Sequence, residues 1–441
     1  MGFLLRMEAL FFEILFVMTE VVGKPSSWAL QKTMFLFWID LGQVLRVMTM
    51  PAYGWSEGTY NTFKHIDLVY VFANLVSSVI PRYSLFVFGS FLVLLALADT
   101  AYALKVFKRA AKVQTMWPIK LLRMLVATVV TILFSSVLKW LLIPIECEVS
   151  SERSLSSYLH GEDAPCTPWI FPEYLFSVFT IAISITYILF ALVVSLLSFE
   201  INPLARGVRS QCTGRVEVLW IVSKVAVTFV AYLARWVQPV TCGVVFLLMM
   251  LFVLYRHLQL MPFHRHETNV IRGGVFTCCC WLALATTIVA AAENSLASSE
   301  EWWLLGFTPV FFLVGAGGTH YLHVRISRSI ERLRAEFTYQ KQLREEKSKQ
   351  DSWQRGSSFR EAKTGNTPAW EKFYDPTWES RKAFKSEDKA RVVLRTLLYR
   401  RDKSDVPFLI HLMQRALEEY PDSVNLRIFE LLLVRFVKQD Q

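Results

Sequence analysis

The sequence predicts an all-α fold, a polytopic membrane helix bundle of nine or ten membrane helices with a small cytoplasmic C-terminal helical domain. Composition is the first observation: 54% of the 441 residues are hydrophobic and 19% are charged, against about 25% charged in soluble domains. The apolar residues also fall in blocks of about 20, enough for a helix to cross about 30 Å of hydrocarbon. Charged helical patterns follow the last block.

Nine blocks are predicted to span a membrane, and they cover residues 28–50, 64–81, 84–107, 118–144, 171–199, 217–237, 241–260, 270–292 and 302–324. Residues 8–22 form a tenth candidate, which is short and acidic and either spans or lies in the interface. The N-terminal segment lacks a small-residue cleavage site, so it does not fit a cleavable signal peptide.

The loops between these blocks predict the orientation. Three loops are basic, with Lys105, Lys108, Arg109 and Lys112; Arg206, Arg209 and Arg215; and Arg256, Arg265 and Arg272. The alternating loops at 146–166 and 293–301 are acidic. Because basic loops stay in the cytoplasm, the C-terminus is expected there too. The net charge of +10 therefore indicates contact with the bilayer and its anionic headgroups, not with nucleic acid.

The cysteines are sorted by compartment. Cys147 and Cys166 flank the longest external loop, where an oxidising environment favours a disulfide over two free thiols. Cys278, Cys279 and Cys280 are expected to be small packing residues. Cys212 is expected to be an unmodified loop thiol, with palmitoylation as the alternative.

Six charged residues fall at bilayer depth: Asp40, Asp67, Asp99, Lys139, Lys224 and Arg235. Such residues are costly in hydrocarbon and face the bundle interior. Counting from the cytoplasmic helix ends places Asp99 and Lys224 roughly 11–12 Å deep, which predicts an ion pair between them. The alternatives are separate polar partners or a polar path for ions.

Two short motifs have a structural and a functional interpretation. "GAGG" at 315–318 favours close helix packing over a flexible gate. "HRH" at 264–266 favours a loop that contacts lipid phosphates over a metal site, because residues i and i+2 do not share a helix face. No motif pairs a nucleophile with a base, so we expect no enzyme activity, cofactor or metal.

The predicted domains are residues 1–325, the bundle; 326–385, a juxtamembrane helix and linker; and 386–441, a helical-repeat-like unit. Apolar residues at three- and four-residue steps mark a partner-binding face on its last two helices, which contains Phe408, Leu409, Leu412, Ala416, Ile428, Leu431, Leu432 and Phe436.

Five stretches follow one another along the chain: "WALQKTMFLFWIDLGQVLRVMTMPAYGW", "LLRMLVATVVTILFSSVLKWLLIPIEC", "GRVEVLWIVSKVAVTF", "LMPFHRHETNVIRGGVFTCCCW" and "ALEEYPDSVNLRIFELLLVRF". Their order resembles that of the tiny macrocysts (TmcB-like) family of membrane proteins. The last stretch is similar to the start of the family's cytoplasmic tetratricopeptide-like repeats. The resemblance implies architecture more than mechanism.

A single repeat unit would expose apolar surface, because such units bury their faces on neighbours. Either the closing helices dock on a partner subunit or on the juxtamembrane helix, or the sequence is a fragment; docking is favoured. We therefore expect a non-enzymatic scaffold or signal-relay subunit. The plasma or ciliary membrane is favoured over an organelle membrane as its location. The alternative is an ion channel or transporter subunit with a path lined by the intramembrane charges.

Overall fold

The computed structural model describes residues 28–67, 70–71, 83–109, 121–122, 124–149, 173–197, 211–233, 238–292, 298–356, 384, 386–400, 406–423, 426–427, 429–430 and 433. Within these residues there are twelve α-helices and no strand, apart from one isolated bridge between Gln211 and Phe263. The all-α prediction is confirmed for this part of the chain.

The chain divides into two compact units, which are described separately. The first contains α2 (Trp28–Met48), α3 (Glu57–Ile66), α5 (Tyr83–Arg109), α7 (Phe134–Val149), α9 (Glu173–Leu197), α10 (Arg215–Leu233), α11 (Pro239–Leu260), α12 (His266–Ala291) and α13 (Ser298–Gly306). The second contains α15 (Glu387–Arg400) and α16 (Val406–Glu419). Helix α14 (Thr308–Gly356) contributes residues 308–320 to the first unit and 321–356 to the second.

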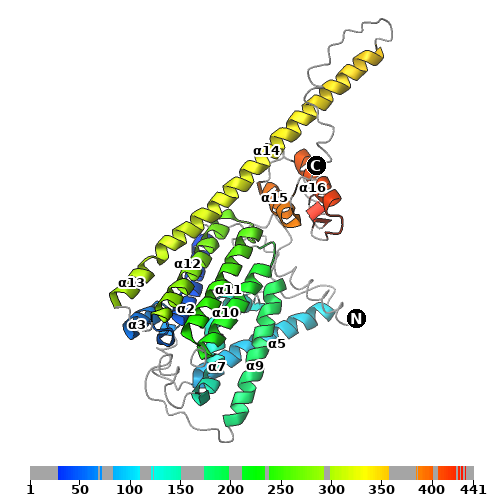
Figure 1. The fold of residues 1–441 in the computed structure, drawn as a ribbon. Helices are drawn as coiled ribbons and strands as arrows, with labels where there is room; N and C mark the ends of the chain where they lie inside the picture. The colour runs from blue at the N-terminus through cyan, green and yellow to red at the C-terminus, as the bar shows by residue number, and fades with distance from the viewer. Residues whose placement is uncertain are drawn as a thin grey trace. The chain divides into compact units, whose positions relative to one another are not determined.

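The first unit has two hydrophobic cores. One lies between α2, α10, α11 and α12, and the other between α5, α7 and α9 (Figure 1). Helix α10 joins the cores, because it packs against α2 and α11 on one side and against α7 and α9 on the other. The charged residues discussed below lie on the inner faces of these helices.

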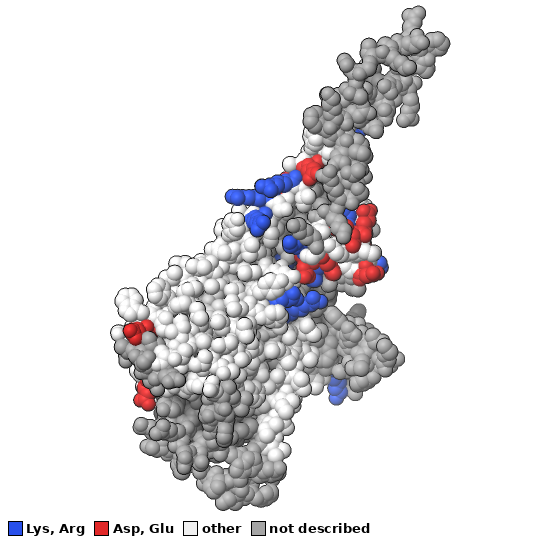
Figure 2. All heavy atoms as spheres, in the orientation of Figure 1, with Lys and Arg blue, Asp and Glu red and all other residues white. Residues whose placement is uncertain are grey.

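Five helical segments are long and apolar enough to cross a membrane: Leu85–Ala103, Val178–Leu196, Pro239–Leu260, His266–Ala291 and Ser299–Glu346. The outward faces of α5, α9 and α11 expose large apolar side chains, and the face in Figure 2 is largely uncharged over the first unit. These features are compatible with a membrane protein. The count of nine or ten spans is not confirmed, since residues 8–22 and most of 64–81 lie outside the described residues.

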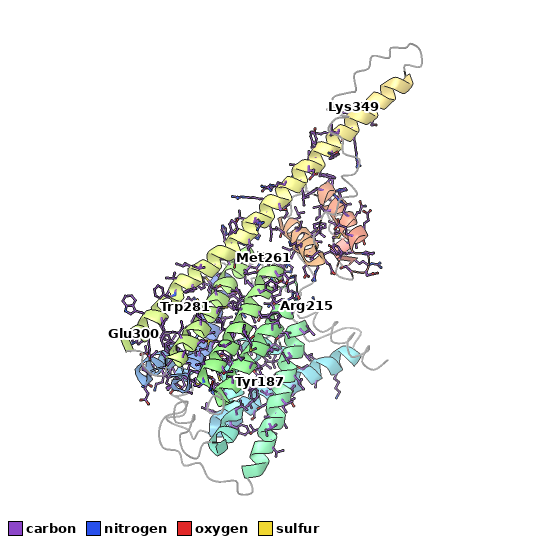
Figure 3. All side chains as sticks on the ribbon, in the orientation of Figure 1. Tyr187, Arg215, Met261, Trp281, Glu300 and Lys349 are labelled. Atoms are coloured by element: carbon purple, nitrogen blue, oxygen red, sulfur yellow. The ribbon has the colours of Figure 1, made fainter. Side chains whose placement is uncertain are left out.

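A π-helix, η2 (Val126–Ile132), interrupts the predicted span at 118–144. Its hydrogen bonds reach one residue further than in an α-helix, as from Leu133 N to Thr128 O at 2.8 Å. Two of its carbonyls accept from neighbouring helices. Gln43 Nε2 of α2 donates to Ile132 O at 2.8 Å, and the Tyr187 hydroxyl of α9, labelled in Figure 3, donates to Val129 O at 2.7 Å. Both donors stabilise the segment, and π-helices occur often at functional sites.

Helix α14 joins two elements that the sequence predicts separately, the last span at 302–324 and the juxtamembrane helix after it. The helix runs for 49 residues without a break and crosses the predicted domain boundary at 325–326. Exposed charged residues beyond the apolar segment do not stop a helix, because Arg, Glu, Lys and Gln have high helix propensity.

Candidate functional site

A cluster of buried charged side chains lies between α2, α10 and α12. Asp40 of α2 is at its centre. One of its carboxylate oxygens forms an ion pair with Lys224 of α10. The other accepts hydrogen bonds from Trp220 Nε1 at 2.7 Å and from the Arg272 guanidinium at 3.1 Å. A single carboxylate therefore connects all three helices.

Arg272 extends the cluster to a second carboxylate. Its guanidinium donates to both oxygens of Glu217, at 3.3 and 3.4 Å. It also lies 4.6 Å from the ring centroid of Phe37 and 4.8 Å from that of Phe276. A planar guanidinium suits this site because it can bind two carboxylates and stack on aromatic faces at the same time.

The local sequence explains why these side chains meet. Within each helix they are three or four residues apart, the spacing that puts side chains on one helix face. The members are Phe37 and Asp40; Glu217, Trp220 and Lys224; and Arg272 and Phe276.

The cluster is buried and electrically neutral. Asp40, Glu217, Lys224 and Arg272 are each at most 7% exposed, and two carboxylates balance two cations. Removing one partner from such a set leaves an uncompensated buried charge and costs about 3–5 kcal/mol. Because both oxygens of Asp40 already have partners, the arrangement is suited to fixing three helices and not to binding a substrate.

A second buried ion pair joins α2 to the segment after α3. Arg46 Nη1 lies 3.4 Å from Asp67 Oδ2, and the guanidinium carbon of Arg46 lies 3.8 Å from the ring centroid of Tyr70. The other oxygen of Asp67 accepts from the backbone N–H of Tyr70 at 3.2 Å. This carboxylate also has its charge compensated.

The predicted pair between Asp99 and Lys224 is wrong, because Lys224 pairs with Asp40. Counting residues gives the depth of a side chain but not its neighbouring helix, and α10 packs on α2. Asp99 is buried on α5, where the described residues offer it no hydrogen bond or ion pair. Lys139 is buried on α7. Arg235 lies outside the described residues.

Glu301 forms a third buried polar site, which the sequence analysis missed. This residue of α13 is 3% exposed. Its carboxylate accepts from Ser56 N at 2.9 Å, from Ser56 Oγ at 2.6 Å and from Thr59 Oγ1 at 2.6 Å. Ser56 is also the N-cap of α3, accepting from Thr59 N. The clamp fixes the start of α3 to α13.

The GAGG motif contributes one close helix contact. A Cβ on Gly315 would lie 2.2 Å from Thr277 Oγ1 and 2.7 Å from the carbonyl oxygen of Gly273. Helices α14 and α12 can approach closely here because Gly315 and Gly273 have no side chain. Gly317 and Gly318 face open space. Close packing therefore explains Gly315 and not the last two glycines.

The predicted contact of the HRH motif with lipid phosphates stays a prediction. His264 is 7% exposed, and His266 Nε2 lies 2.9 Å from His320 Nδ1. Asn269 holds the loop, with hydrogen bonds to the N–H and the carbonyl oxygen of Phe263 at 3.1 and 2.8 Å. Within the described residues, no group of three or more His, Cys, Asp or Glu side chains is placed to hold a metal.

The second unit buries the apolar face predicted for the tail. Phe408, Leu409, Leu412 and Ala416 of α16 are at most 3% exposed. They pack with α15 and with Ile326, Ile330, Leu333 and Phe337 of α14. The predicted docking of the tail on the juxtamembrane helix is thus confirmed for α16, and α15 covers it as well. Ile428, Leu431, Leu432 and Phe436 lie outside the described residues; Leu426, Phe429 and Leu433 are buried instead.

This packing bears on the predicted partner-binding residues. Phe337 lies 5.4 Å from Phe408 and 4.9 Å from His411, measured between ring centroids. The face of α16 that carries Phe408, Leu412 and Ala416 is therefore covered by the chain itself. Partner binding through this face stays a prediction, and it would require the covering helices to separate.

The predicted disulfide also stays a prediction. Cys147 belongs to α7, but its side chain and all of Cys166 lie outside the described residues. None of the cysteines whose side chains are described, Cys212, Cys242, Cys278, Cys279 and Cys280, is in a disulfide. Cys278, Cys279 and Cys280 are buried in α12.

The sequence analysis placed Glu217 and Arg272 at the starts of predicted spans and counted Arg272 among the basic loop residues. Helix α12 begins at His266, four residues before the predicted span, so Arg272 lies well inside the helix and not at its end. Glu267 was the available signal, because acidic residues mark the first turn of a helix.

Comparisons of this chain with protein-family models, with curated proteins and with solved structures find no match.

Proposed function

We propose that this protein is a non-enzymatic integral membrane protein that acts as a scaffold or signal-relay subunit through its cytoplasmic helices. Helix α14 carries the proposal. Its start packs against α12 at Gly315, and its later residues pack with α15 and α16, all within one continuous helix. In this proposal, α14 relays a movement of the bundle to α15 and α16.

The charge network supports a packed bundle over a conducting path. Asp40, Asp67 and Lys224, three of the residues expected to line a path, are engaged in ion pairs between helices. The basic loops support a cytoplasmic C-terminus, and Arg215 is exposed where it could meet anionic headgroups. We include in this proposal a relationship to the tiny macrocysts proteins and a location in the plasma or ciliary membrane.

Cross-linking in native membranes tests the scaffold role. The full chain should form specific cross-links from Lys389 of α15 to other subunits, and Phe408→Ala, which unpacks the tail, should remove them. Gly317→Ala, at an open position on α14, serves as the control. Cross-links that survive in Phe408→Ala would contradict a role for the packed tail.

A second candidate function, an ion channel or transporter, is favoured by one observation. Several buried polar oxygens of α5 and α9 have no partner among the described residues, namely those of Ser90, Asp99, Thr180 and Ser184. Flux of monovalent cations into liposomes that contain the purified chain tests it. Equal flux in empty liposomes and in Asp99→Asn liposomes would exclude this path.

A further inference from the structure

Three buried aspartates of the first unit differ in their partners. Asp40, Asp67 and Asp99 are 4%, 2% and 6% exposed. Asp40 meets two cations and Asp67 meets one. For Asp99, no described residue supplies a cation or a donor, and its Oδ2 is buried without a hydrogen bond. The three residues have the same side chain and similar burial, so they differ mainly in whether a cation compensates the negative charge.

The position of Asp99 on α5 is on the inner face. Val93, Ala96 and Ala103 are at most 1% exposed and lie three to six residues away along the same face, whereas Leu94 is 50% exposed on the opposite side. Asp99 therefore lies in the core between helices and not beside the apolar exterior.

The register with α7 places Asp99 near the π-helix. Gly89 of α5 packs on Trp140, and α5 also contacts η2. The two helices are antiparallel in the predicted topology. Asp99 lies ten residues after Gly89 on α5, and Val130, within η2, lies ten residues before Trp140.

Among the described residues, the charged groups of the surrounding elements lie at other levels of the bundle. On α7, Lys139 is nine residues from Val130, about 14 Å at 1.5 Å per residue. On α9, the Tyr187 hydroxyl is engaged by Val129 O. On α5 itself, Lys105 is exposed. The π-helix contains only Val, Ala, Thr and Ile.

An ionised carboxylate that is buried without a cation is very unfavourable, and such a group is neutralised by taking up a proton. We propose that Asp99 is a proton-binding site of the helix bundle, whose carboxyl group holds a proton at neutral pH. The proposal does not depend on the scaffold role, because it rests only on the α5–α7–α9 core.

A hydrophobic carbodiimide tests the proposal, since it reacts with protonated carboxyl groups in apolar surroundings. The acid proton moves to a carbodiimide nitrogen while a carboxyl oxygen adds to the central carbon, and the adduct rearranges to a stable N-acylurea that retains every atom of the reagent. The full chain in liposomes is treated across a pH series, and peptides that contain Asp40, Asp67 and Asp99 are quantified by mass spectrometry.

At neutral pH we expect modification of Asp99 to exceed that of Asp40 and Asp67 at least tenfold and to fall as the pH rises. The proposal would be overturned if Asp99 were modified only in acid, near pH 3.9, which is about the pKa of an ordinary aspartate side chain. So would equal modification of all three residues.

Two controls make each outcome decisive. The first control is the double variant Asp99→Asn/Leu94→Asp, which has a carboxyl group on the exposed face of α5 in place of the buried one. Modification of the new aspartate shows that the reagent reaches α5. If it does, an unmodified Asp99 in the parent protein contradicts the proposal. Replacing choline chloride by sodium chloride at equal ionic strength should not change the modification. Protection by sodium would overturn the proton assignment in favour of a cation.

Discussion

Lys224 of α10 forms an ion pair with Asp40 of α2 in the interior of the first unit, and the same carboxylate binds Arg272 of α12. We expect Asp40→Asn and Lys224→Met each to lower the free energy of unfolding by about 3–5 kcal/mol, because each leaves a buried charge uncompensated. Thermal unfolding followed by tryptophan fluorescence measures the change. Glu267→Gln, an exposed charge on α12, is the matched control and should have almost no effect.

The double variant Asp40→Asn/Lys224→Met separates pairing from general damage. It should be more stable than the sum of the single effects predicts, since each substitution removes the other's unpaired group. Strict additivity would show that the two residues do not stabilise one another.

The contact between α12 and α14 predicts different results for neighbouring glycines. Gly315→Ala should destabilise the protein by about 1–3 kcal/mol, because the new methyl group would overlap Thr277 and the Gly273 backbone. Gly317→Ala, where nothing lies within 4 Å, should be neutral or stabilising by about 0.5–1 kcal/mol through helix propensity. The midpoints of thermal unfolding give the comparison; the reverse order would contradict the close contact.

The tail predicts a difference between two residues of α16. Phe408 is 3% exposed and Ile410 is 36% exposed. Phe408→Ala should cost about 3–5 kcal/mol of local stability, because it leaves a cavity against Phe337. Hydrogen exchange of α15 and α16 should then accelerate, with Ile410→Ala close to the parent protein. Equal exchange in the two variants would show that the cluster does not hold the tail.

The Glu301 clamp predicts coupling between residues far apart in the sequence. Glu301→Gln and Ser56→Ala should each destabilise the protein, and a double-mutant cycle should give a coupling of about 1.5–3 kcal/mol, as for hydrogen bonds to a charged group. Glu300→Gln, an exposed neighbour, is the control. A coupling near zero would mean that the hydrogen bonds contribute no stability.

The apolar blocks predicted helix positions well where hydropathy alone decides them. Helices α5, α9 and α11 begin and end within two residues of the predicted spans. The start of α12 was missed because its first turn is polar and faces other protein groups, so no hydropathy change marks it.

Partners across the bundle were harder to predict. The depth of Lys224 was available from counting, but the choice between Asp40 and Asp99 depends on which helices are neighbours. The π-helix could not be predicted from its own sequence either. The two side chains that donate hydrogen bonds to its carbonyl oxygens, Gln43 and Tyr187, come from α2 and α9. Glu301 was assigned to an acidic loop, since its partners Ser56 and Thr59 are more than 240 residues away.

The neutrality of the cluster around Asp40 has an electrical consequence. A membrane potential performs work of about 2.3 kcal/mol per elementary charge and 100 mV when a charge crosses the whole field. Asp40, Glu217, Lys224 and Arg272 together carry no net charge, so a joint displacement of α2, α10 and α12 moves no gating charge through the cluster. If the first unit lies in a polarised membrane, voltage cannot drive that displacement by acting on these four residues.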